Sequence, residues 1–206
     1  SVIIPTKDRI DLLSVCLKGL LEKTTYANFE ILVVDNNSAE ARTFEYFETI
    51  EKNEKVSVLK FPGEFNFSAI NNFAVSKAKG DVLVLLNNDI EVISEGWLRE
   101  LVSHAIRLDI GAVGCRLYYP DDYVQHDGII VGIGGVAGYA HPRMERSASG
   151  AFGRSRVICN YSAVTAAVLA VKRSTFNEVS GFDEGNLAVA FNDVDFCLRL
   201  AEAGYR

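Results

Sequence analysis

The chain has 206 residues, of which 49% are hydrophobic and 23% are charged, and this composition predicts one globular domain with a substantial core. The net charge is −6 and the basic residues are scattered, so we expect no nucleic acid among its partners. A ligand that carries phosphate would therefore need a local device, such as a metal ion or a helix N-terminus.

The cysteines and the hydropathy indicate the cellular compartment. The four cysteines lie far apart without a C-x-x-C pair, so the sequence suggests neither a disulfide framework nor a zinc site and predicts reduced core residues. No apolar run approaches the roughly 20 residues that cross a bilayer, and no secretion signal is visible, so we expect a cytoplasmic protein. Because the chain opens inside a strand-like run and closes just after a helix, we expect a fragment truncated at both ends.

Strand and helix patterns alternate over the first ninety residues. The patterns predict strands at 1–6, 30–35, 56–61 and 81–87 and helices at 10–21, 39–53 and 67–80. Asp8 is expected to cap the first of these helices, and Gly80 to close the third. This alternation predicts an α/β fold with a mainly parallel central sheet and helices on both faces.

The rest of the chain is less regular. It predicts helices at 96–107 and 193–204, strands at 111–119, 128–133 and 163–173, and a long loop at 134–154. His126 and His141 have no His or Cys partner at metal spacing and are expected in loops. We expect a single domain over 1–206, with a nucleotide-type half at 1–90 and an irregular half at 91–206.

Three of the predicted strands end in polar residues. These ends are Pro5-Thr6-Lys7-Asp8, Asp35-Asn36-Asn37-Ser38 and Asn87-Asn88-Asp89. In an open parallel sheet, ligands bind beyond the carboxyl ends of the strands. There Asp35 would bind ribose or base, and Asp89 would supply the hard oxygen that Mg²⁺ or Mn²⁺ prefers. Turn formation is the alternative role, and we favour it for the asparagines Asn36, Asn37 and Asn87.

Five segments together resemble the family 2 glycosyltransferases, which are inverting enzymes with the GT-A fold. These segments are "SVIIPTKDR", "EILVVDNNS", "GDVLVLLNNDIEV", "TAAVLAVKRSTFNEVSGFDE" and "NDVDFCLRLAEAGYR". The resemblance implies a single GT-A domain with a Rossmann-like nucleotide-binding half at 1–90 and an acceptor-binding half at 91–206. Asn87-Asn88-Asp89 stands at the place of the family's D-x-D motif, with Asn87 where most members have Asp. Asp89 is thereby implied as the ligand of Mn²⁺ or Mg²⁺.

The same resemblance implies roles for other residues. The implied nucleotide-sugar contacts are Pro5, Thr6, Asp8, Asp35, Lys60 and Asn88. Asp193 matches the catalytic base of the Glu-Asp-x-Asp pattern, in which Asn192 replaces the Glu. Asp183 and Glu184, in the segment "GFDE", match residues near the acceptor site.

Plainer roles exist for several of these carboxylates. Asp193 and Asp195 stand at the start of a predicted helix, where the interaction of each negative charge with the helix dipole would stabilise the helix by about 0.3–1 kcal/mol. Asp195 is also spaced to pair with Arg199 at i,i+4. Asp183 can cap a loop. For Asp193 the resemblance favours the catalytic role; for Asp195 both readings stay open.

The expected reaction is metal-assisted single displacement of a sugar from a UDP- or dTDP-sugar to a saccharide or lipid-linked saccharide. The sugar is expected to be a hexose or deoxyhexose, and similar domains, rhamnosyltransferases among them, build bacterial polysaccharides. A lipid-linked acceptor would make the protein peripheral to a membrane. An inactive nucleotide- or sugar-binding module is the alternative, supported by Asn87 and Asn192. A sugar-nucleotide pyrophosphorylase would require a Gly-rich, basic loop after the first strand, and "PTKDRIDLL" is not one.

Overall fold

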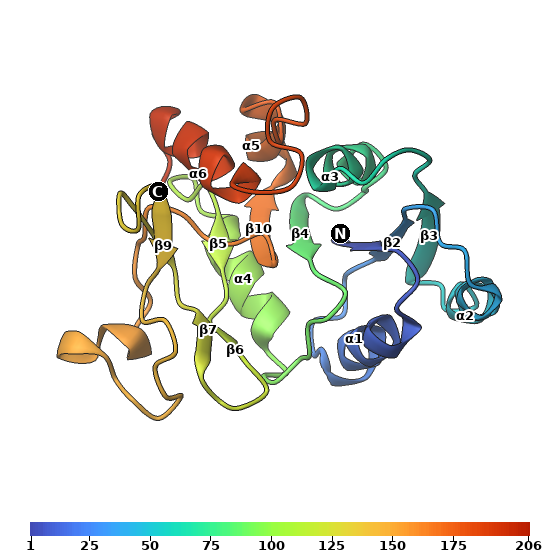
Figure 1. Ribbon diagram of the computed structural model, residues 1–206, viewed down its shortest axis with the longest axis horizontal. Helices are drawn as coiled ribbons and strands as arrows, with labels where there is room; N and C mark the ends of the chain where they lie inside the picture. The colour runs from blue at the N-terminus through green and yellow to red at the C-terminus, as the bar shows by residue number, and fades with distance from the viewer.

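A computed structural model describes all residues from Ser1 to Arg206. It consists of a central sheet with helices on both faces and two short hairpins beside it (Figure 1). The strands are β1 (Val2–Thr6), β2 (Ile31–Asp35), β3 (Val56–Lys60), β4 (Val82–Leu86), β5 (Val113–Gly114), β6 (Leu117–Tyr118), β7 (Val124–His126), β8 (Ile129–Val131), β9 (Ala137–Tyr139) and β10 (Val168–Lys172). The helices are α1 (Ile10–Lys23), α2 (Ala41–Ile50), α3 (Phe67–Val75), α4 (Trp97–Ala105), the 3₁₀ segment η1 (Ala151–Arg156), α5 (Arg173–Glu178) and α6 (Asn192–Glu202).

The central sheet has six strands in the order β3-β2-β1-β4-β10-β5. β1 pairs in parallel with both β2 and β4, and β2 with β3, whereas β10 runs antiparallel to both of its neighbours. The predicted α/β fold with a mainly parallel sheet is therefore confirmed. The order of the strands also places a change of direction between β1 and β4, since the chain first builds outward to β3 and then returns to the other side of β1.

The core forms two layers, one on each face of the sheet. Successive strand residues point to opposite faces, so Ile3 packs in the layer under α3, α5 and α6, while Val2 and Ile4 pack against α1, α2 and α4. Figure 1 shows these two groups of helices on opposite sides of the sheet. The aliphatic runs of β1, β2 and β4 are buried on both faces, as expected for this class of sheet, whereas the edge strand β3 is partly exposed.

Several predicted boundaries in the first half are wrong. Asp8 does not cap α1; its carboxylate accepts hydrogen bonds from the backbone N–H groups of Ala39 and Glu40 and so caps α2. α3 ends at Val75, not at Gly80, because the chain turns at Ser76 and runs on without helical structure to β4.

The second half departs further from the sequence predictions. The strand expected at 111–119 is two short strands, β5 and β6, in different sheets, and the expected loop at 134–154 contains β9 and the beginning of η1. The strand expected at 163–173 begins only at Val168. α5 and β7 were not predicted. β5 to β9 have only two or three residues each, which is too few for an alternating pattern to emerge.

Two predictions about single residues also need correction. His126 is not in a loop; it lies in β7 and is only 1% exposed, whereas His141 is in a loop as predicted. Burial lowers the pKa of His126 to about 4, so this imidazole is neutral at physiological pH. Among the free cysteines, Cys16 and Cys197 are core residues, but Cys115 and Cys159 are only partly buried.

None of the helices combines the length and the apolar character needed to cross a membrane.

Candidate nucleotide-sugar pocket

A pocket opens at the carboxyl ends of β1 and β4, where the order of the strands reverses. This is the place where open α/β sheets bind their ligands. The pocket holds about 400 Å³, within the range of small-molecule sites. Its lining residues are Pro5, Thr6, Lys7, Asn36, Phe65, Phe67, Ile70, Asn87, Asn88, Thr165, Ala166, Ala167, Val189, Asn192 and Asp193.

The ends of β1 and β4 are joined by a side-chain hydrogen bond. The amide Nδ2 of Asn88 donates to Oγ1 of Thr6 at 3.0 Å, and this hydroxyl donates in turn to the carbonyl oxygen of Asp8 at 3.3 Å. Thr6 is 5% exposed, so a buried polar contact fixes its position at the base of the pocket. The structure thus brings three of the residues singled out from the sequence, Pro5, Thr6 and Asn88, to one place.

Asp193 reaches the same pocket from the first turn of α6. Its Oδ2 accepts the backbone N–H of Ala166 at 3.1 Å, and its Oδ1 accepts the N–H of Val194 at 2.9 Å. The carboxylate is partly exposed and lines the pocket, so it can also meet a bound molecule. A carboxylate in this position can take a proton from a hydroxyl group held in the pocket.

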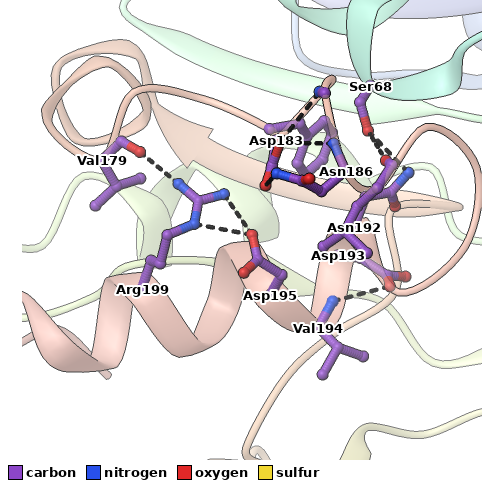
Figure 2. Close-up of polar contacts among 12 residues, drawn as sticks. Ser68, Val179, Asp183, Asn186, Asn192, Asp193, Val194, Asp195 and Arg199 are labelled. Atoms are coloured by element: carbon purple, nitrogen blue, oxygen red, sulfur yellow. Dashed lines mark hydrogen bonds and ion pairs between the residues drawn. The ribbon is translucent and has the colours of Figure 1, made fainter.

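Asp195 has a different environment. It forms an ion pair with Arg199 across one turn of α6, with Nε and Nη2 both 2.8 Å from Oδ2 (Figure 2). It does not line the pocket. The pairing at i,i+4 that the spacing suggested is therefore confirmed.

Asp89 follows β4, and its carboxylate is exposed and accepts no hydrogen bond from the protein. No group of three or more His, Cys, Asp or Glu side chains comes together anywhere in the chain to hold a metal ion. Mg²⁺ and Mn²⁺ do not need such a group when they bind with a diphosphate, since one or two carboxylates then suffice beside phosphate oxygens and water. Asp89 itself is not among the residues that line the pocket. It directly follows Asn88, which is, and its carboxylate has no partner in the protein that would compete with a metal ion.

Three further nucleotide-contact candidates do not line the pocket. Asp35 ends β2 and is 5% exposed, and its Oδ1 accepts the N–H of Ser38 at 2.9 Å. The carboxylate of Asp8 accepts a hydrogen bond from the backbone N–H of Glu40 at the N-terminus of α2, and Lys60 is exposed at the end of β3. All three lie on the same edge of the sheet as the pocket, because β1, β2 and β3 are parallel.

Asp183 and Glu184 lie in the loop between α5 and α6. Asp183 accepts the N–H groups of Gly185 and Asn186, and its other oxygen accepts Nδ2 of Asn186 at 2.9 Å (Figure 2). Glu184 accepts Nδ2 of Asn72 from α3 at 3.0 Å. Both carboxylates thus stabilise the loop, and neither lines the pocket.

The sequence reading missed part of the pocket wall. Thr165, Ala166 and Ala167 precede β10 but were assigned to the strand itself, and the apolar side chains of Phe65 and Val189 lie in loops. The partial signal was the segment "TAAVLAVKR", which contributes to the family resemblance without showing where its strand begins.

Comparison with known proteins identifies the family. The family model described as glycosyl transferase family 2 matches residues 1–140. This chain belongs to glycosyl transferase family 2. The match covers both strand ends of the pocket, while Asp193 lies beyond it.

Two curated relatives match the chain over its whole length. It is 47% identical over 206 residues to the uncharacterized protein y4gI of Sinorhizobium fredii, and 42% identical over 207 residues to the O-antigen biosynthesis protein RfbC of Myxococcus xanthus. The chain spans 23% of the first of these proteins and 16% of the second. The chain therefore corresponds to less than a quarter of each relative.

Solved structures agree on the fold. The mannosyltransferase PcManGT of Pyrobaculum calidifontis, in complex with GDP-Man and Mn²⁺, matches with a TM-score of 0.72 and 18% identity, over 100% of this chain and 52% of that one. GalNAc-T7 with UDP, GalNAc and Mn²⁺ matches with a TM-score of 0.78 and 16% identity, over 99% of this chain and 40% of that one. The predicted GT-A fold is thereby confirmed.

Proposed function

We propose that this glycosyltransferase domain moves a hexose or deoxyhexose from a UDP- or dTDP-sugar to a saccharide acceptor, with inversion at the anomeric carbon. The observation that carries the proposal is the position of Asp193. Asp193 lines one pocket together with Thr6 and Asn88 from the ends of β1 and β4. A proton acceptor and a nucleotide-type strand end therefore face the same space.

Inversion follows from a single in-line displacement. The oxygen of an acceptor hydroxyl attacks the anomeric carbon while the bond from that carbon to the diphosphate oxygen breaks, and its electron pair leaves with the diphosphate. Asp193 takes the hydroxyl proton as the new glycosidic bond forms. The backbone N–H of Ala166 holds Oδ2 of Asp193 at 3.1 Å and so fixes the direction in which the base points.

Asp89 is the residue we propose to hold Mn²⁺ or Mg²⁺, and an ion bound there would neutralise the leaving diphosphate. Both structural neighbours named above were solved with Mn²⁺, which supports a divalent ion in a fold of this kind. The exposed, unpartnered carboxylate of Asp89 is consistent with this role.

The donor nucleotide and the acceptor are the finer parts of the proposal. We assign the base or ribose to Asp35 beside Pro5 and Thr6, with Asp8 and Lys60 further out, and acceptor contacts to Asp183 and Glu184. One neighbour carries UDP and the other GDP-Man, so the experiment below compares both nucleotides. The O-antigen relative supports a saccharide acceptor. That the acceptor is lipid-linked, and that the protein is cytoplasmic and peripheral to a membrane, stay predictions.

Calorimetric titration of UDP, dTDP and GDP, with and without Mn²⁺, tests the donor site. We expect UDP or dTDP to bind, and to bind more tightly with Mn²⁺. Asp89→Ala should remove the Mn²⁺-dependent part of the affinity, while the matched variant Asp81→Ala, which changes an exposed aspartate just before β4, should leave it unchanged. Metal-independent binding in every case would support a nucleotide-binding module without transferase activity, and no binding at all would contradict the donor site.

A further inference from the structure

Asn192 is a buried polar residue in the wall of the pocket. It is the first residue of α6 and is only 3% exposed, yet it lines the pocket beside Asp193. Its side chain bridges two other parts of the molecule. Nδ2 donates to Oγ of Ser68 on α3 (Figure 2) and to the carbonyl oxygen of Val189, both at 3.2 Å.

These contacts determine which way the amide points. The carbonyl oxygen of Val189 can only accept a hydrogen bond, so the side of the amide that faces it must be the NH₂ group. The hydroxyl of Ser68 already donates to the carbonyl oxygen of Leu187 at 2.5 Å, so it too acts as an acceptor toward Asn192. Oδ1 of Asn192 is therefore directed away from both partners.

Oδ1 is the free end of this amide. It accepts no hydrogen bond from the protein, and it is absent from the set of buried polar atoms that lack a partner. It therefore keeps contact with solvent, and the space that Asn192 lines is the pocket. A fixed acceptor atom, neutral and already oriented, is what a site needs to recognise a hydroxyl or amide N–H group.

The same contacts explain why a carboxylate would not suit this position. Aspartate, which has the same shape as asparagine, would present an oxygen to the carbonyl of Val189 and to a hydroxyl that donates elsewhere, and a buried charge without a donor is costly. The site is built for an amide. It leaves Asp193 as the only carboxylate among the lining residues.

We propose that Asn192 is a specificity-determining residue whose Oδ1 accepts a hydrogen bond from a hydroxyl or amide N–H group of the sugar being transferred. The inference rests on the proposed function, since it requires a sugar nucleotide in this pocket. Asn192 and Asp193 are adjacent, so the contact also fixes the sugar relative to the base. Ser68 and Val189 act as positioning residues that hold the amide in place.

The test compares a sugar nucleotide with its nucleotide alone. Calorimetry with Mn²⁺ would measure UDP, UDP-glucose, UDP-N-acetylglucosamine, dTDP and dTDP-rhamnose against the wild-type chain and Asn192→Ala. We expect the affinity for the sugar nucleotide that binds best to fall roughly tenfold in Asn192→Ala, the loss of about one uncharged hydrogen bond, while affinity for the nucleotide alone stays the same. Ser68→Ala, which frees the amide but keeps Oδ1, should show a smaller fall of the same kind.

Asn186→Ala is the matched control. Asn186 donates a hydrogen bond to Asp183 within the loop between α5 and α6 that also contains Val189, but it does not line the pocket. This variant should therefore leave the affinities for the nucleotide and for the sugar nucleotide unchanged. Equal losses for nucleotide and sugar nucleotide, or no loss in Asn192→Ala, would overturn the inference and leave the proposed function standing. If the wild-type chain binds none of these five molecules, the proposed function and the inference both fail.

Discussion

Replacing Asp8 should destabilise the fold far more than its place in an exposed loop suggests. Its Oδ1 accepts the N–H groups of Ala39 and Glu40 and the hydroxyl of Thr43, each at 3.0 Å. Ala39 and Glu40 immediately precede α2 and Thr43 lies in its first turn, and the N-cap residue Glu40 makes no side-chain capping hydrogen bond of its own. One side chain from the β1–α1 connection thus fixes the start of α2 and the end of the β2–α2 loop.

The expected cost can be estimated from the contacts. Loss of an N-cap costs about 0.5–2 kcal/mol, and loss of negative charge at a helix N-terminus about 0.3–1 kcal/mol. Asp8 also has a φ of 52°, in the left-handed region that aspartate and asparagine tolerate better than alanine. Asp8→Ala should therefore lower the free energy of unfolding by about 2–3 kcal/mol. Asp8→Asn, which keeps an acceptor oxygen and tolerates this φ, should cost about 0.5–1 kcal/mol.

The effect should depend on pH with a defined sign. Hydrogen bonds from Glu40, Thr43 and Ala39 lower the pKa of Asp8 and outweigh the opposing effect of burial. A carboxylate with a lowered pKa in the folded state stabilises the protein above its unfolded pKa of about 3.9, and that stabilisation is lost as the pH falls through the folded value. The difference in stability between wild type and Asp8→Ala should be full at pH 7 and should shrink below about pH 4.

Urea denaturation followed by circular dichroism at pH 7 and at a series of lower pH values measures both effects. Asp11→Ala serves as a control, because Asp11 is an exposed aspartate that pairs with Arg9 at the start of α1 and anchors no second helix, so this variant should lose clearly less stability than Asp8→Ala. If Asp8→Ala costs no more than Asp11→Ala, or if its cost does not vary with pH, then the carboxylate is not the cap that the hydrogen bonds describe.

Further predictions concern the pocket. Asp193→Asn should lower kcat by about 10²–10⁴-fold while calorimetry shows unchanged binding of nucleotide, and a kcat near wild type would exclude Asp193 as the base. Asp195→Asn should leave kcat within about twofold, because its partner is Arg199; a large loss would mean that Asp195 takes part in the reaction. Asn87→Asp should tighten Mn²⁺-dependent binding of UDP by adding a second carboxylate beside Asp89, and weaker binding would argue that the two side chains do not share one ion.

The parallel half of the fold could be predicted because its strands and helices are long enough to show their hydrophobic patterns locally in the sequence. The strands around Ile3, Val33 and Leu85 are runs of aliphatic residues buried on both faces, and α1 repeats its apolar residues at helical spacing. The small hairpins gave no such signal. Their strands are only two or three residues long, and their pairing depends on contacts such as the bridge between Ile129 and Ala163, which are distant in sequence.

The site was predictable in part for the same reason. Thr6 and Asn88 end strands that any parallel arrangement brings to one edge, so their shared position followed from the pattern. The role of Asp8 was misjudged because its donors come from a helix thirty residues away, which spacing alone cannot reveal. Thr165 was missed because only the antiparallel insertion of β10 beside β4 carries it to the pocket.

The polar residues that line the pocket are mostly uncharged amides. Four asparagines line the pocket, at positions 36, 87, 88 and 192, whereas Lys7 and Asp193 are its only charged residues. A carboxylate 4 Å from a diphosphate oxygen would cost about 4 kcal/mol at an effective dielectric constant of 20. An amide offers donors and an acceptor without that repulsion. In a chain with a net charge of −6, the proposed function would gain from asparagine at these positions, because the repulsion of an anionic donor stays low when no cation is bound. Asp193, the single carboxylate of the lining, would then be left for the acceptor's proton.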